Sequence, residues 1–356
     1  MLLMKKNKGV ALITALLVVA LATIMAVALT SRQYIDIRRT GNMMKSDQAF
    51  LDAIAAETFV AHTLASFRSE GGSKYDDLTL FNLALTQLSG DMSDDNRLVS
   101  VQALYPESRF NVNTLVKIDD KPNEKQIKVF RRLLRSVLTD LNVNPGEVDS
   151  LISNLIDWID ANEEARIDGA EDGVYEGKDP PYKAANRMLT SISELRLVEG
   201  FSEELLDGVP ADEEQEIEAI DGLLAYVDAL PDRVSTINVN SVIKPQVFQS
   251  LGTYMEDTMV EDLMNAQPFE ELTNFTGHET FDSIKSSEKD GGANWKDLKK
   301  EIKEYTGSLD VQSSYFLIKT NVAVGKTVVD LNTLVYVSTD GTKLEVISRA
   351  IGTDGI

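Results

Sequence analysis

Residues 10–29 read VALITALLVVALATIMAVAL, a run of twenty residues without a charge, a glycine or a proline. At about 1.5 Å per residue, a helix of this length spans about 30 Å, the thickness of the hydrocarbon layer of a bilayer. A short basic leader, MLLMKKNKG, precedes the run and favours a cytoplasmic N-terminus. The arginines that follow the run, at positions 32, 38 and 39, weaken this orientation signal. The segment therefore predicts one membrane-spanning helix.

An ordinary secretory signal peptide is the alternative, with a small-residue cleavage site at Ala26-Val27-Ala28. However, the apolar run exceeds the usual 7–15 residues of such a signal. An apolar helical face also continues beyond it through roughly residue 67, and the first turn signal is EGGS at 70–73. We therefore expect one retained helix, apolar over 10–29 and amphipathic over 30–70.

Composition limits what the rest of the chain can do. Its 356 residues carry a net charge of −22, which repels nucleic acid and anionic lipid and suits metal cations or basic protein surfaces. The chain has no cysteine, so disulfides, thiolate zinc sites and thiol nucleophiles are excluded. With only two histidines, little imidazole chemistry is available.

The leader and the start of the apolar run resemble the processing signal of the type IV pilin class, which a prepilin peptidase cuts after a glycine. The resemblance implies cleavage between Gly9 and Val10, methylation of the new amino terminus and retention of the helix. Pilins normally carry Glu as the fifth mature residue, where it neutralises the amino terminus of a neighbouring subunit. Here that residue is Thr14. Because a buried ionised Glu is costly unless paired, a subunit with nothing stacked above it would not need one.

Short segments in the same order resemble the protein K family of minor pseudopilins of the type II (general) secretion system. They are LIDWIDAN at 155–162, GAED at 169–172, PPY at 180–182, LTSISELR at 189–196, and the Asn-x-Asn segments FNVNTL at 110–115 and INVNS at 237–241. The resemblance covers effectively the whole chain. It implies an inner-membrane, single-pass assembly subunit with a periplasmic C-terminal domain. With the minor pseudopilins I and J, this subunit would cap the pseudopilus, start its assembly and support export across the outer membrane.

Periodicity gives a compatible plan. Residues 97–105, 314–324, 327–337 and 343–351 read as strands, and helical spacing prevails between the first strand and the second. We predict an α+β fold with a pilin-like long N-terminal helix packed on a small antiparallel sheet, and a large all-α domain inserted between the strands. The predicted segments are leader 1–9, membrane span 10–29, helix continuation 30–70, start of the head 71–110, first helical unit 111–232, second helical unit 233–305 and final strands 306–356.

An acidic loop after Trp158 has the ligand spacing of an EF-hand calcium loop, with Asp160 as its first position. Ala165 occupies the position where such loops favour Gly, so the backbone need not follow the EF-hand. Hard oxygen ligands favour calcium, and the protein K resemblance also implies it. The alternative is an acidic loop that only faces water. The candidate ligands are Asp160, Asn162, Glu164, the Arg166 carbonyl, Asp168, Glu171 and Asp172, and Asp157 and Asp179 could complete the site.

Other function classes receive little support. The two Asn-x-Asn segments suggest two related helical units, but no basic cluster interleaved with aromatic residues accompanies them, so we expect no nucleic-acid partner and interpret the Asn side chains as turn and cap groups. No catalytic motif is present, and we expect no enzyme. The competing hypotheses are a periplasmic, secreted or lipid-anchored calcium-dependent binding protein with an ordinary signal peptide, and a tip subunit of a type IV pilus.

Overall fold

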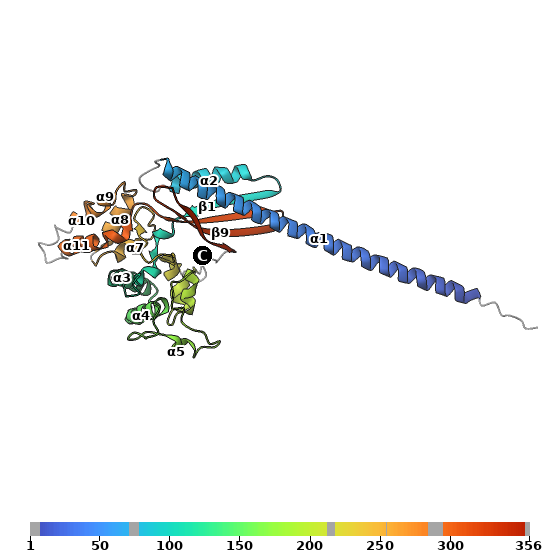
Figure 1. The fold of residues 1–356 in the computed structure, drawn as a ribbon, viewed down its shortest axis with the longest axis horizontal. Helices are drawn as coiled ribbons and strands as arrows, with labels where there is room; N and C mark the ends of the chain where they lie inside the picture. Colours follow the sequence, from blue (N-terminus) through green and yellow to red (C-terminus); the bar gives the residue numbers. More distant parts are fainter. Residues whose placement is uncertain (1–7, 71–77, 212–217, 254, 284–294, 353–356) are drawn as a thin grey trace, which may run out of the picture.

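The computed structural model describes residues 8–70, 78–211, 218–253, 255–283 and 295–352 (Figure 1). A long helix, α1 (Lys8–Ser69), runs without interruption for 62 residues, so it is about 93 Å long. From Val10 to Leu29 its large apolar side chains are each at least half exposed. The predicted continuous helix is therefore present, and its first half projects away from the rest of the chain.

The second half of α1 packs on a four-stranded antiparallel sheet. Strand order is β1 (Arg97–Leu104), β8 (Tyr315–Val324), β9 (Thr327–Val337), β10 (Leu344–Ile351). The helix meets the sheet mainly through small residues at helical spacing, which allow close approach. The buried residues of this contact are Ala49, Ala53, Ala56, Val60, Ala61, Leu64 and Ala65. A second helix, α2 (Leu78–Met92), packs against β1. The four predicted strands and the antiparallel sheet are confirmed.

Two helical units lie between β1 and β8, which are neighbours in the sheet but far apart in sequence. The second unit lies at the end of the molecule opposite the apolar half of α1, and the first unit lies below the sheet (Figure 1). The helices of the first unit are α3 (Glu124–Asp140), α4 (Val148–Ile159), α5 (Asp172–Tyr175) and α6 (Glu203–Asp207). Those of the second are α7 (Pro245–Ser250), α8 (Asp257–Asn265), α9 (Leu272–Thr276), α10 (Thr280–Ser283) and α11 (Trp295–Tyr305). Short 3-10 turns at 106–108, 112–115, 145–147, 192–197, 223–225 and 306–308 link these elements.

The inserted units are not purely helical, which corrects the all-α expectation. Each contains a short parallel strand pair, β2 (Phe110–Asn111) with β5 (Val227–Asp228) in the first unit, and β6 (Ile237–Asn238) with β7 (Leu309–Asp310) in the second. A further antiparallel pair joins β3 (Gly208–Val209) to β4 (Ile220–Asp221). Two-residue strands leave almost no periodic signal in a sequence, so periodicity does not predict them.

The two Asn-x-Asn segments hold these strand pairs in the same way. In each segment the first Asn accepts a hydrogen bond from the backbone NH of the second, as predicted for turn residues. The second Asn binds the backbone of a distant segment. Asn113 pairs with the NH and carbonyl of Leu189, and Asn240 pairs with those of Phe269. These amides therefore fasten each helical unit at its entry point.

A buried ion pair fixes the last strand to α1. The Glu57 carboxylate, 1% exposed, receives two hydrogen bonds from the Arg349 guanidinium, each 2.9 Å long. It also accepts one from the Thr333 hydroxyl at 2.7 Å. The Arg349 side chain is 43% exposed, so the two charges differ in their access to water. Loss of Arg349 should therefore cost more stability than loss of the Glu57 charge, because the carboxylate is buried and the guanidinium can reach water.

We expect Arg349→Ala to lower the free energy of unfolding by about 3 kcal/mol, because it leaves a carboxylate buried without its cation. Glu57→Gln should cost about 1 kcal/mol, since the freed guanidinium reaches water and the amide can still bind Thr333. Urea denaturation of the full chain in detergent measures both values. Equal losses for the two variants would show that the asymmetric burial of the pair does not matter.

Candidate functional site

The processing segment lies at the start of α1. Gly9 and Val10 fall within its first turns, and residues 1–7 of the leader lie outside the described residues. Beyond them α1 is long and apolar enough to cross a membrane, and the window of it that meets this test is not buried against the chain. The apolar side chains of this segment therefore need lipid or other helices to cover them.

Thr14, which stands where pilins carry Glu, satisfies its own hydroxyl. The hydroxyl group donates to the carbonyl oxygens of Val10 and Ala11, both at 3.0 Å. A carboxylate at this position would instead require a positive partner in an apolar environment. The helix start therefore needs no charged group from a neighbour.

Three carboxylates are buried together in the first helical unit, and we call them the acidic cluster. Asp157 and Asp160 stand at the end of α4 and are 0% and 1% exposed, while Glu171, which precedes α5, is 7% exposed. Arg166 pairs with the two aspartates, its Nε lying 3.2 Å from Asp157 and its Nη2 lying 3.2 Å from Asp160. These four residues, when ionised, carry more negative than positive charge.

Burial shifts the titration of the acidic cluster upward. It raises the pKa of Glu171 to about 7, and the charges of Asp157 and Asp160 add to the shift. It raises the pKa of Asp157 to about 6, against the opposing effect of Arg166, and it also raises the pKa of Asp160. These acids bind protons more tightly in the folded chain, so their contribution to the free energy of unfolding falls as pH rises from about 4 to about 7.

Both carboxylate oxygens of Glu171 are buried without a hydrogen-bond partner in the described part of the chain. Such orphaned charges are costly in a protein interior unless a cation offsets them. Asp157 also lies close to the Gly169 backbone, because a Cβ at Gly169 would lie 2.0 Å from its Oδ2. The cluster therefore fits a bound cation chemically.

The structure brings together only part of the predicted ligand set. Asp160 and Glu171 lie in the acidic cluster, whereas Asn162, Glu164 and Asp168 are exposed. Asp172 pairs instead with Lys183. Over the described ranges no group of three or more His, Cys, Asp or Glu side chains is arranged to hold a metal ion. The ligand set thus stays a prediction, of which only Asp160 and Glu171 lie in the acidic cluster.

Ligand spacing does not predict two members of this site, the side chain of Arg166 and the carboxylate of Asp157. The Arg166 carbonyl, predicted as a ligand, accepts a hydrogen bond from the Gly169 NH, and its side chain is the part that enters the cluster. Asp157 accepts a hydrogen bond from the Arg166 NH at 3.0 Å. Asp157 lies in the last turn of α4 and Asp160 caps its C-terminus, so the two aspartates stand three residues apart at one end of the helix.

Aromatic side chains form the wall behind the acidic cluster. Trp158 packs edge-on against Tyr175 and Tyr182, with ring centroids 5.1 Å and 6.3 Å away. The Tyr175 hydroxyl accepts a hydrogen bond from the Glu199 NH. The LIDWIDAN and PPY segments, separated in the sequence, therefore meet in space at one site.

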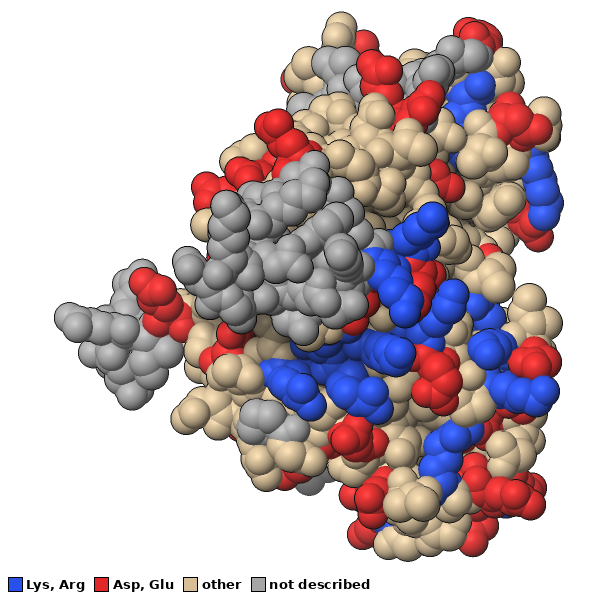
Figure 2. Space-filling view, turned by 90° about the vertical axis from the view of Figure 1, so that its left-hand side faces the viewer, with Lys and Arg blue, Asp and Glu red and all other residues tan. Residues whose placement is uncertain are grey.

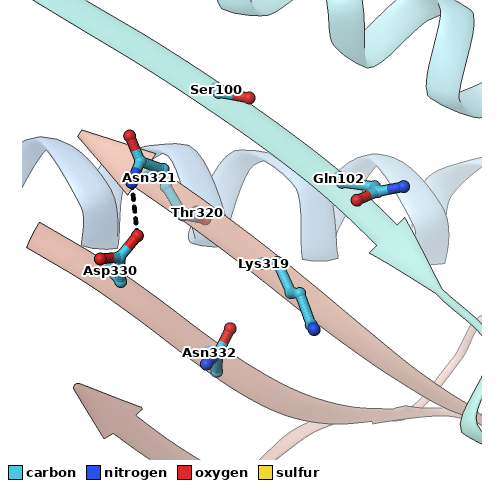
Figure 3. A pocket seen from close by; sticks show the side chains of 7 residues that line it. All are labelled: Ser100, Gln102, Lys319, Thr320, Asn321, Asp330 and Asn332. Atoms are coloured by element: carbon cyan, nitrogen blue, oxygen red, sulfur yellow. Dashed lines mark hydrogen bonds between the residues drawn. The ribbon is translucent and has the colours of Figure 1, made fainter. Parts of the chain in front are cut away.

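A second polar site lies on the sheet face opposite α1 (Figure 3). Its cavity, of about 260 Å³, is lined from three strands by Ser100, Gln102, Lys319, Thr320, Asn321, Asp330 and Asn332. Asn321 donates a hydrogen bond to Asp330, and Lys319 contributes a positive charge. These seven lining residues include no histidine or other group paired with a hydroxyl as a general base. This cavity is a polar patch of the sheet surface.

Comparison with known proteins gives a consistent result. A family profile described as type II secretion system (T2SS), protein K matches residues 108–209. The chain is 31% identical to a type II secretion system protein K of Aeromonas hydrophila over 72% of this chain and 74% of that protein. The chain belongs to the type II secretion system protein K family. A protein K of Pseudomonas aeruginosa is 29% identical over 98% of this chain and 94% of its own length.

The protein K family resemblance seen in the sequence is therefore confirmed, and with it the minor pseudopilin class. The fold is also shared with a chain of the crystal structure of a GspK-GspI-GspJ complex from the type 2 secretion system of enterotoxigenic Escherichia coli. That match has a TM-score of 0.61 at 19% identity and covers 88% of this chain and 99% of the other. The predicted fold class is confirmed by this likeness and by the strand order.

Proposed function

We propose that the chain occupies the tip of the periplasmic pseudopilus, where it assembles with the minor pseudopilins I and J, starts filament assembly and supports export across the outer membrane. The placement of the two helical units carries this proposal. The second unit lies at the end of the head opposite the apolar half of α1, and the first unit extends below the sheet (Figure 1). In a filament of this kind the next subunit stacks above the head. The inserted units occupy that space and would prevent stacking.

Two further observations support the tip position. Thr14 bonds within its own helix, so the start of α1 has no carboxylate to offer the amino terminus of another subunit. The outer side of α1 over the sheet exposes Met44, Leu51 and Phe59, each by more than half. Helices of neighbouring subunits would cover these residues, and the similar chain of known structure is part of a GspK-GspI-GspJ complex.

The proposal includes the route by which the subunit reaches this place. Residues 10–29 anchor it in the inner membrane with the head in the periplasm, and prepilin peptidase removes the leader between Gly9 and Val10, after which Val10 is methylated. The subunit acts by position and shape and not as an enzyme.

We further propose that calcium binds at the acidic cluster. Asp157, Asp160 and Glu171 would hold it, with the exposed loop residues completing the site. Bound calcium supplies two positive charges, which offset the repulsion among the buried carboxylates. The observation in support is the pair of buried Glu171 oxygens without a hydrogen-bond partner in the described ranges. The Arg166 guanidinium, which pairs with both aspartates, would then be free to turn toward solvent.

We expect the full chain produced with prepilin peptidase to start at methylated Val10 and to keep the apolar segment. Gly9→Leu should abolish this cleavage because the peptidase cuts after the glycine, whereas Gly41→Leu should be processed normally. Gly41 is a matched control since it also lies in α1, and a Cβ there would meet no atom within 4 Å. Intact mass and N-terminal sequencing decide the outcome. A start near Leu29 would instead support the secreted calcium-binding alternative.

We expect gold-labelled antibody against an epitope tag at the C-terminus to mark pseudopili at one end only. Thr14→Glu should leave this pattern unchanged, because the bulk of the inserted units still prevents a subunit from stacking above. A second variant serves for comparison. It combines Thr14→Glu with replacement of residues 106–313 by a short turn between β1 and β8. This variant should be labelled along the filament, since the obstruction is gone. Label along filaments made with the intact chain would contradict the tip position.

Calcium at 100 times its Kd should raise the free energy of unfolding by about 2.7 kcal/mol. Gly169→Ala should abolish this gain because the new methyl group collides with Asp157, whereas Gly173→Ala, where a Cβ meets no atom within 4 Å, should retain it. Trp158 fluorescence during urea unfolding, in a Trp295→Phe background, reports locally on the cluster. A full calcium effect in Gly169→Ala would exclude this location for the ion.

A further inference from the structure

Helix α3 carries an unusual concentration of positive charge for a chain of net charge −22. Five bases recur along its sequence, EKQIKVFRRLLRSVLTD, at the spacing of one helix face. The opposite face is apolar and buried in the core of the first unit. The bases are Lys125, Lys128, Arg131, Arg132 and Arg135.

Helix α11 extends this face. The Lys125 amino group donates to the Glu304 carbonyl at 3.3 Å, and Arg132 donates to the Tyr305 hydroxyl at 3.2 Å, so the C-terminal end of α11 lies against α3. Lys300 and Lys303 of α11 are exposed. Figure 2 shows a band of Lys and Arg across this end of the molecule, which faces left in Figure 1, away from the apolar half of α1. We call the five bases of α3 together with Lys300 and Lys303 the basic face.

Little of this charge is neutralised within the described residues. Arg131 pairs with Asp149 at 2.9 Å, and Arg132 lies 3.6 Å from Glu301. No carboxylate of the described ranges forms an ion pair with Lys128 or Arg135, and both side chains are exposed. Like charges gathered on one helix repel one another and reduce its stability. A negatively charged group bound to this helix would offset the repulsion among its bases.

We infer that the basic face binds an acidic surface of a partner protein. A lipid surface fits poorly, because the apolar side of α3 is already buried and none of the exposed large apolar side chains of the described chain lies on α3. Nucleic acid fits poorly because the only aromatic residue of α3, Phe130, is 0% exposed and offers no base-stacking surface. Charge complementarity across a protein interface instead needs only what this face presents. The basic face presents the same charges wherever the subunit sits, so binding there does not depend on the tip position.

A fluorescent oligoglutamate of about twenty residues is a suitable probe for the full chain in a non-ionic detergent. We expect it to bind in low salt despite the net charge of −22, and to be released as salt increases. Lys128→Glu with Arg135→Glu should weaken binding by about tenfold or more, since both charges of the centre are inverted. Lys45→Glu with Lys326→Glu is the matched control, an equal charge change at two exposed lysines on α1 and the β8–β9 turn. This control should keep the affinity.

Fluorescence anisotropy measures these affinities, and Trp158 unfolding curves establish that each variant is folded. No binding by the unmodified chain, or equal losses in the two double variants, would overturn the inference. Tighter binding of phosphatidylglycerol vesicles or of a DNA oligonucleotide than of oligoglutamate, lost in the α3 variant, would overturn it in favour of a lipid or a nucleic acid. Selective loss of oligoglutamate binding in the α3 variant alone would support it.

Discussion

The exposed apolar half of α1 is the constraint on which the rest of the structure depends. Its uncharged twenty-residue run projects from the molecule with no described part of the chain covering it, and water cannot solvate so large a continuous apolar surface without cost. The apolar half of α1 must therefore be covered by membrane lipid or by other helices. The second half of the same helix packs on the sheet, so the head is rigidly joined to whatever holds the apolar half. Movement of the helix along its axis necessarily carries the whole head with it.

The insertion of two helical units into one edge of a small sheet raises a second physical problem, since a long insert can move relative to its host. Side-chain amides fix the segment through which the chain enters each unit. Asn113 binds both the NH and the carbonyl of Leu189 inside the first unit, and Asn240 binds those of Phe269 inside the second. Such an amide is satisfied only in one geometry, so each costs free energy if the entry segment shifts against its own unit. The Glu107 carboxylate, 2% exposed, adds a similar tie by accepting from the Ser314 NH where the chain returns to the sheet.

Sequence patterns predict this fold where the periodic burial of apolar residues determines the structure. They fail where the structure depends on the direction of individual side chains. The strands at 315–324 and 327–337, and the single long helix, follow directly from the spacing of apolar residues. The acidic loop is placed correctly, but ligand spacing does not show that the Arg166 side chain enters the cluster, because only the folded backbone determines this direction. The basic side of α3 escapes notice for a related reason. The apolar stripe of α3 indicates a core helix, and it does not show that lysines of α11 join the bases on the opposite side of α3.

Charge distribution, and not net charge, sets what this surface can bind. A net charge of −22 predicts repulsion of acidic partners, but with a Debye length of about 8 Å in physiological salt a ligand senses only the charges near it. On the basic face those charges are positive along α3 from Lys125 to Arg135, about three helical turns. The acidic cluster shows the reverse arrangement, with negative charge concentrated inside the same unit. The acidic cluster and the basic side of α3 share no residue, so a cation and an acidic partner could be bound to the same unit without competing for the same groups.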